Sequence, residues 1–166
     1  MSFMGRLERR WDARQTGMEL VGVEVSVEIS VPAKDLWSFI LHPKSAQLTD
    51  PRVVNAFRVP GTPVEEVGEQ QCIVSDRGGV LSAQIGEIVA LEAPRLVAVR
   101  WLTLAGGFIS RHLLDDLGRR SRLMYQLEGQ VLAGSGKSAQ KQMRTDAAES
   151  LARWRTAVES GARFPA

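Results

Sequence analysis

The feature that most constrains this chain is a strict alternation of apolar and other residues shortly after its N-terminus. Apolar side chains occupy every second position of this segment: Val21, Val23, Val25, Val27, Ile29 and Val31. Successive side chains of a strand point to opposite faces of a sheet, so this period predicts one buried and one solvated face. Pro32 ends the ladder because it has no N–H to donate, and the same property suits it to the first turn of a helix. The sequence therefore predicts a strand over 21–31 that leads directly into a helix.

Two short helices are predicted between this strand and the next one. The first covers 33–41 and has apolar residues at helical spacing on one side: Leu36, Trp37 and Ile40. Pro43 interrupts it, because the residue before a proline is disfavoured in the helical conformation. A second helical turn is predicted around 45–48, bounded by Pro51.

The middle of the chain consists of short apolar runs separated by turn residues. The predicted strands cover residues 53–59, 69–75, 80–91, 96–104, 108–114 and 122–132. Glycine, proline and aspartate gather between them, as in Pro60-Gly61-Thr62-Pro63 and Asp76-Arg77-Gly78-Gly79. Regularly spaced strands joined by short turns are typical of an antiparallel meander.

The last predicted element is a long amphipathic helix. Gly134 and Gly136 end the strand pattern, and the period becomes helical over 137–160. Its apolar residues recur every three or four positions: Met143, Ala147, Leu151, Trp154 and Val158. Charged residues lie mainly on the other faces, so one side of this helix is predicted to pack on the sheet.

Three stretches, taken in chain order, resemble the START-like superfamily, also called SRPBCC or helix-grip proteins. They are SVPAKDLWSFILHP at 30–43, LEAPRLVAVRWL at 91–102 and HLLDDLGRRSRLMYQLEG at 112–129. The second resembles the acidic-x-Pro-Arg-x-Leu…Trp pattern of the superfamily, and the third resembles its L-x-x-x-G-x-x-T-x-L hairpin. Ser121 stands where Thr is common, and His112 stands where an aromatic residue is common. Members include polyketide cyclases/dehydrases, Bet v 1-like plant allergens and lipid carriers.

The resemblance implies an α+β helix-grip fold as a single domain over 21–162. In that fold an antiparallel, curved sheet of six or seven strands wraps around the long C-terminal helix, with two short helices between the first two strands. One helix does not cover a twisted sheet completely, so an apolar cavity is expected between them.

Residues 1–20 are expected to form an N-terminal extension. Its arginines alternate with Glu8 and Asp12, while Leu7 and Trp11 lie four positions apart. One interpretation is a flexible, solvated terminus. The other is a short surface helix that docks on the domain or contacts a second copy in a homodimer. Met18 is an alternative start of the chain, and one sequence does not decide between them.

Strand parity and helix spacing together predict the lining of the cavity. The predicted ligand-binding residues of the strands are Val99, Trp101, His112, Leu114, Leu123, Tyr125 and Leu127. The last helix contributes Met143, Ala147 and Leu151. A register slip or a bulge would move any of the strand residues to the opposite face.

His112 and Tyr125 are the candidates for catalysis. An imidazole changes protonation near neutral pH, and with a neighbouring tyrosine hydroxyl it could polarise a carbonyl of the ligand or remove a proton beside it. The alternatives are a histidine that hydrogen-bonds its neighbours within the sheet or points outward, and one that contacts a ligand without catalysing a reaction. The sequence offers no stronger acid–base group, so it leaves open whether the protein is an enzyme.

Three functions compete at this point. The first is binding of a hydrophobic or amphipathic small molecule such as a lipid, a quinone or a polyketide-like compound. The second is an enzyme of the polyketide cyclase or dehydratase type, in which the same cavity works mostly by positioning its substrate. The third, implied by some START-like relatives, is a ribosome- or chaperone-associated interaction module. The sparse set of acid–base groups favours the first.

Other classes of site find little support. The nitrogen and sulfur ligands available to a metal are His42, His112 and Cys72, in no motif spacing, so neither a metal nor a cofactor is expected. Residues 134–138 resemble a phosphate-binding loop, but Val131 stands where that motif requires glycine. A net charge of +2 is too small to favour a nucleic-acid partner.

Localisation follows from what the sequence lacks. No stretch approaches the roughly 18 consecutive apolar residues of a membrane helix, so membrane insertion is not expected. The first residues contain no apolar core of a signal peptide, and Cys72 has no second cysteine to pair with. We therefore expect a cytoplasmic protein.

Overall fold

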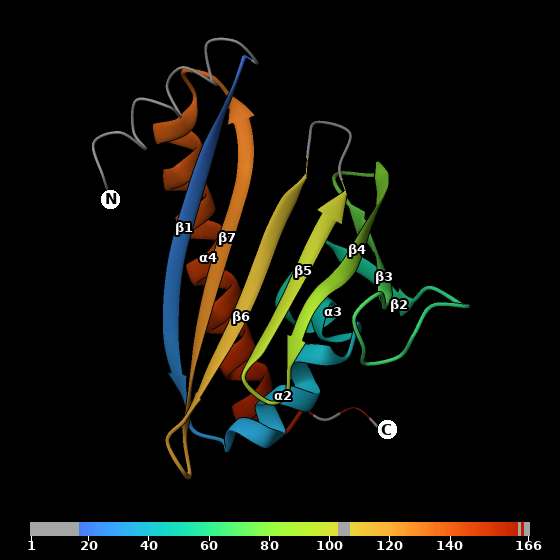
Figure 1. Cartoon of the computed structure of the whole chain (residues 1–166), viewed down its shortest axis with the longest axis vertical. Coiled ribbons are helices and arrows are strands. Elements are labelled where there is room, and N and C mark those ends of the chain that lie inside the picture. Colours follow the sequence, from blue (N-terminus) through green and yellow to red (C-terminus); the bar gives the residue numbers. More distant parts are fainter. Residues whose placement is uncertain (1–16, 103–106, 163, 165–166) are drawn as a thin grey trace.

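A computed structural model describes residues 17–102, 107–162 and 164 of the chain. Its described strands form a seven-stranded antiparallel sheet in the order β1-β7-β6-β5-β4-β3-β2 (Figure 1). The strands are β1 (Met18–Ile29), β2 (Val53–Arg58), β3 (Gln70–Asp76), β4 (Leu81–Glu92), β5 (Leu96–Leu102), β6 (Phe108–Asp116) and β7 (Ser121–Leu132). The helices are α2 (Ala33–Leu41), α3 (Ser45–Thr49) and α4 (Gly136–Glu159). The predicted helix-grip architecture is confirmed.

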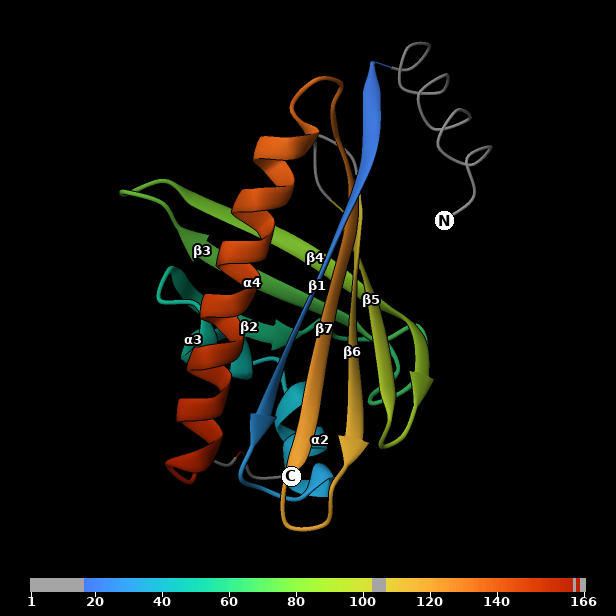
Figure 2. The same cartoon turned by 90° about the vertical axis from the view of Figure 1, so that its left-hand side faces the viewer.

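The sheet is strongly twisted, and α4 lies across its concave face. Strands β1, β7 and β6 run roughly along α4, whereas β2, β3 and β4 cross its direction at a steep angle (Figure 2). Helices α2 and α3 connect β1 to β2 and cover the end of the sheet where β1 stops (Figure 1). The right-handed twist of strands is the physical origin of this curvature.

The alternation of β1 behaves as the sequence predicts, but the strand starts earlier than expected. Val21, Val23 and Ile29 are buried, Val25 and Val27 are half-buried, and the alternate residues from Gly22 to Glu28 are exposed. Pairing with β7 is continuous from Met18↔Leu132 to Ile29↔Ser121, so the strand includes three residues assigned to the N-terminal extension. Backbone pairing with an equally long partner, rather than side-chain alternation, sets this boundary. The rest of the predicted extension, 1–16, lies outside the described residues.

Side chains of α4 cover the outer edge of β1. Gln140 Nε2 donates to the Gly22 carbonyl at 2.7 Å, and Arg144 Nη1 donates to the Glu24 carbonyl at 3.2 Å. An unpaired strand edge is a template for association with other chains, and polar side chains over it occupy those backbone groups. The helix therefore closes the sheet laterally as well as covering its face.

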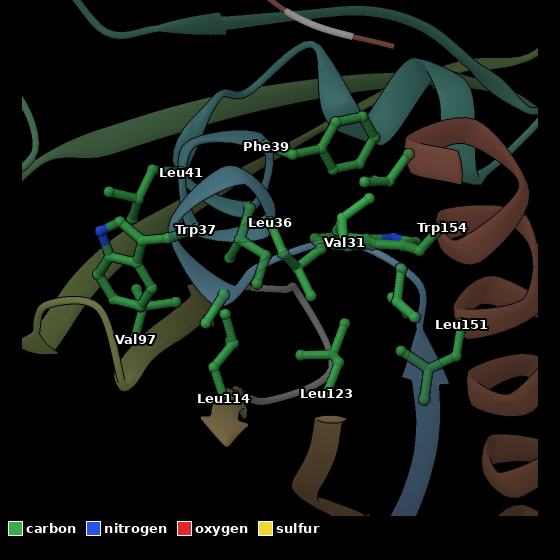
Figure 3. Close-up of a cluster of buried hydrophobic side chains, with 14 of the residues drawn as sticks. Val31, Leu36, Trp37, Phe39, Leu41, Val97, Leu114, Leu123, Leu151 and Trp154 are labelled. Atoms are coloured by element: carbon green, nitrogen blue, oxygen red, sulfur yellow. The ribbon is translucent and has the colours of Figure 1, made fainter. Parts of the chain in front are cut away.

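The apolar side of α4 packs where the sequence predicts. Its buried residues include Ala147, Leu151, Trp154 and Val158. At the end of the sheet beneath α2, Leu151, Trp154 and Val158 join a dense core with side chains from β1, α2, β6 and β7 (Figure 3). Leu36, Ile29 and Leu123 are fully inaccessible there. This core fills one end of the space between the sheet and α4, and it does not extend to the other end.

Candidate ligand cavity

A cavity of about 270 Å³ lies between the sheet and α4, beyond the dense core. It is called the inner chamber here. Its apolar walls come from α2, from strands β3 to β5 and from α4, including Ile40, Leu41, Ile73, Ile88, Val97, Val99, Leu151 and Trp154. Aromatic and polar side chains from β5, β6 and β7 complete it: Trp101, Phe108, Ser110, His112 and Tyr125. Helix α3 and the turn after it supply the remaining side.

A second chamber of about 560 Å³ adjoins the first and is called the outer chamber. The two share part of their walls, including Asp50, Phe108 and Tyr125. The outer chamber also has exposed charged side chains, namely Arg52, Arg77, Asp146 and Glu149. The path from solvent to the inner chamber therefore runs from a charged rim to an apolar interior.

Eight of the ten predicted ligand-binding residues lie on these walls. Val99, Trp101, His112, Tyr125 and Leu151 line the inner chamber. Leu127, Met143 and Ala147 line the outer chamber, which Tyr125 also reaches. Leu114 and Leu123 belong to neither lining, because they pack under α2 in the dense core (Figure 3). The binding role of all ten stays a prediction.

Several wall residues were not among the predicted ones. Phe108 and Ser110 share the parity of His112 on β6, so strand alternation could have found them. Trp154 follows from the helical period of α4. Side chains from α3 and the start of β2 carry no such signal, because their approach to the sheet depends on how the connection from β1 folds back.

Trp101 is held rigidly in the wall of the inner chamber. Its indole Nε1 donates to Ser110 Oγ at 2.9 Å, and its ring stacks on Phe108 with centroids 6.0 Å apart. The indole also lies close to Gly86 of β4, where a Cβ atom would come within 2.8 Å of the ring. Glycine at this position lets the large side chain lie flat on the neighbouring strand.

His112 and Tyr125 lie side by side on paired strands. They are directly opposite in the β6–β7 register, and their rings are 4.8 Å apart between centroids. The imidazole also stacks on Trp154 of α4 at 5.2 Å, and its Nδ1 is buried without a hydrogen-bond partner among the described residues. The two catalytic candidates are thus adjacent and enclosed by aromatic rings.

Burial keeps both of these side chains uncharged at neutral pH. It lowers the pKa of His112 from 6.5 to about 4, since the cation loses its hydration. It also raises the pKa of Tyr125 to about 12, although hydrogen bonding with the Ser110 side chain acts in the opposite direction. General acid–base catalysis works best with a pKa near the working pH. Neither group meets that condition, so the pair is better suited to neutral hydrogen bonding.

A buried carboxylate braces the end of the chamber near α2. Glu69 is fully inaccessible and accepts hydrogen bonds from Gln71 Nε2 at 2.6 Å and from Arg58 Nε at 3.3 Å. Gln71 Nε2 also donates to the Leu41 carbonyl at the end of α2, at 3.1 Å. A buried charge is tolerated when it is paired and hydrogen-bonded in this way. The network fixes β3 to α2 and holds that wall in place.

Within the described part of the chain, no group of three or more His, Cys, Asp and Glu side chains converges in a way that could hold a metal ion. No helix within the described ranges is long and apolar enough to cross a membrane.

Comparison with known proteins adds evidence at the level of the fold. No family model matches the chain, and no curated protein matches it. Norcoclaurine synthase from Thalictrum flavum, solved with dopamine and hydroxybenzaldehyde, matches with a TM-score of 0.66 at 12% identity, over 90% of this chain and 92% of the synthase. A START superfamily protein from Mycobacterium smegmatis matches with a TM-score of 0.64 at 16% identity, over 84% of this chain and 94% of that protein.

A third solved structure extends the comparison to biosynthetic proteins. The di-domain ARO/CYC StfQ from the steffimycin biosynthetic pathway matches with a TM-score of 0.70 at 12% identity. The match covers 92% of this chain and 55% of StfQ. At such identities the agreement concerns the backbone and not the chemistry of the site. Together with the sheet order and the long last helix of this chain, it shows that the chain has the START-like, helix-grip fold.

Proposed function

We propose that this protein binds a hydrophobic or amphipathic small molecule, such as a lipid, a quinone or a polyketide-like compound, in the two connected chambers. The observation that carries the proposal is the composition of the inner chamber. Its walls are mostly aliphatic and aromatic, and a few neutral polar groups converge on one side. Small-molecule sites typically combine an apolar cavity with a few placed polar groups, in volumes of about 300–1,000 Å³.

The arrangement also suggests how such a ligand would lie. Its apolar body would contact Ile88, Val99 and Leu151, while an oxygen-bearing end would reach the cluster around Ser110 and Tyr125. Any charged part would stay in the outer chamber, because transfer of an unpaired charge into an apolar interior is costly. Among proteins with this fold, norcoclaurine synthase has been solved with two small aromatic compounds, which supports the use of the cavity.

Filling the inner chamber provides the direct test. Val99→Phe would project extra volume into the chamber, and we expect it to weaken binding of a fluorescent fatty acid by at least about 10-fold. Leu102→Phe is the matched control, because Leu102 lies on the same strand and is exposed outside the chamber. Equal affinities of the wild type and both variants would overturn the proposal. Independently of this comparison, native mass spectrometry of protein purified without added ligand would identify a bound compound directly.

A second candidate is a cyclase-type enzyme that uses the same cavity. The adjacency of His112 and Tyr125 favours it, since neutral donors beside an apolar wall can orient a carbonyl, and positioning alone accelerates reactions substantially. The test is to incubate a reactive poly-β-ketone with the protein and compare the cyclised products with those formed spontaneously. If the protein binds the compound but the product distribution is unchanged, the enzyme candidate is ruled out and the binding function remains.

A further inference from the structure

The outer face of the sheet, which points away from α4 (Figure 2), changes character between its two sides. On β1 the outward residues are those of a face in contact with water, and all are exposed: Gly22, Glu24, Ser26 and Glu28. On β4 the first three outward residues are apolar and are also all exposed: Leu81, Ala83 and Ile85. Contact with water therefore does not explain the composition of β4.

Strand parity identifies which residues of β4 and β5 point outward. Gln84 of β4 and Trp101 of β5 line the inner chamber, on the face that α4 covers. Successive side chains of a strand point to opposite faces, so the residues that follow them, Ile85 and Leu102, lie on the outer face.

The apolar residues of the outer face meet across four strands. In the register, Phe57 of β2 lies opposite Cys72 of β3, Cys72 lies opposite Ile85, and Ile85 lies opposite Leu102. Phe57, Ile85 and Leu102 are 39%, 40% and 59% exposed. Contiguous exposed apolar surface marks an interaction site. The outer apolar patch is defined here as Phe57, Cys72, Leu81, Ala83, Ile85 and Leu102.

A pair of opposite charges borders this patch. Glu87 of β4 and Arg100 of β5 are the outward residues next to Ile85 and Leu102, and they lie directly opposite each other in the register. Side chains at such positions are near enough to interact. Within the described part of the chain, however, neither of the two forms an ion pair. Both charges are therefore available to a partner.

The patch and its charged border are self-complementary. Consider a two-fold axis that runs along the strands, midway between β4 and β5, in the plane of contact between two copies. It places Ile85 over Leu102 of the second copy and Glu87 over Arg100 of the second copy, each twice, because such a contact is isologous. Packed sheets keep their strands within about 30° of each other, so residues close to the axis stay in register. An axis across the strands would instead set charged residues against apolar ones.

We propose that the outer apolar patch, together with Glu87 and Arg100, is the interface of a homodimer of this chain. Apolar contacts between the two β4–β5 pairs supply the affinity. The two ion pairs between Glu87 and Arg100 of opposite copies fix the orientation and disfavour other partners. The interface lies on the opposite side of the sheet from both chambers, so it is independent of the proposed binding function.

The first measurement is the oligomeric state of the full chain by sedimentation velocity. Over about 1–300 µM the mean mass should rise from that of a monomer towards that of a dimer. Leu102→Asp should weaken the dimer by at least about 10-fold, because it sets an unpaired charge against an apolar surface. Leu132→Asp is the matched control and should change the dissociation constant by less than about 2-fold. Leu132 is 70% exposed but lies at the end of β7, outside the patch.

Reversing the two charges provides a sharper test. Glu87→Arg sets two arginines against each other at each contact of the dimer, and Arg100→Glu sets two glutamates against each other. Each variant alone should dimerise at least about 10-fold more weakly than the wild type. An equimolar mixture restores opposite charges at both contacts and should form a heterodimer within about 3-fold of the wild-type affinity. Arg155→Glu, on the exposed side of α4, makes the same change in charge and should leave the dimer intact.

The possible results decide for or against this interface. A chain that stays monomeric over the whole range overturns the proposal and leaves the patch to residues 1–16 or to a different protein. A dimer that persists in Leu102→Asp and in both charge reversals also overturns it, because the contact then lies elsewhere. The two-fold pairing is wrong if both reversals are folded by circular dichroism but their mixture does not dimerise. Recovery in the mixture supports the proposal, since a change within one chain does not produce it.

Discussion

The two ends of the space between the sheet and α4 are filled in opposite ways. Beneath α2, Leu36, Leu123 and Val158 are essentially inaccessible and interlock in a dense core (Figure 3). Beyond it, Trp101, Tyr125 and Met143 keep part of their surface accessible around the chambers. Strands β6 and β7 contribute to both ends from the same face. The difference shows that one end holds the fold together, while the other keeps open the space that we propose for a ligand.

The largest loss of stability should come from removing a side chain from the densely packed end. Leu123→Ala would remove apolar atoms from a site with no accessible surface, so we expect the free energy of unfolding to fall by about 2–5 kcal/mol. Urea denaturation monitored by circular dichroism measures this loss. A loss below about 1 kcal/mol would mean that this end is not the densely packed one.

A smaller effect is expected where the wall of the inner chamber meets the sheet. Gly86→Ala would bring a Cβ atom within 2.8 Å of the side chains of Trp101 and Val99, and such overpacking costs about 1–3 kcal/mol. Gly22→Ala is the matched control, because its added Cβ would meet only the Leu127 carbonyl oxygen at 3.7 Å. Thermal unfolding, together with tryptophan fluorescence, compares the two variants. Equal melting temperatures would contradict the tight contact between Trp101 and β4.

Acidification should lower the free energy of unfolding through His112, which lies at the end that contains the chambers. Its pKa is about 4 in the folded protein and 6.5 when unperturbed, so the unfolded chain binds the proton more tightly. The stabilisation is fully present above about pH 6.5 and is lost progressively as the pH falls towards 4. At pH 5 the loss relative to pH 7 should be about 2 kcal/mol, from about 1.4 kcal/mol per pH unit.

Other groups also titrate over this pH range, so the contribution of His112 must be isolated by difference. His112→Gln lacks the titrating imidazole and should lose correspondingly less stability between pH 7 and pH 5, as measured by urea denaturation. Identical losses in the variant and the wild type would argue against a neutral, buried His112.

The smallest change in stability is expected at the outer chamber. Met143 lines that chamber and is only half-buried, so Met143→Ala enlarges an existing opening instead of creating an enclosed cavity. We expect a loss below about 1 kcal/mol, together with a measurable change in affinity for a fluorescent fatty acid. A stability loss as large as that of Leu123→Ala would remove the distinction between the two ends.

Much of the fold and part of the site could be predicted from short-range patterns. The alternation over 21–31 predicts the buried face of β1, and the spacing from Met143 to Val158 predicts the inner side of α4. Parity correctly groups Trp101, His112 and Tyr125 on one face, because they lie in strands whose register is regular there. In β4 the register shifts between Ile88 and Ala90, and parity does not carry across such a bulge.

The sequence by itself determined the elements, their order and the face to which most side chains belong. These properties follow from local backbone geometry, which repeats every two residues in a strand and every 3.6 in a helix. Only the tertiary structure decided that α2 covers Leu114 and Leu123, while the same face stays open at Trp101 and Tyr125. Those outcomes depend on contacts between segments far apart in the chain, and a periodic pattern carries no information about what lies opposite it.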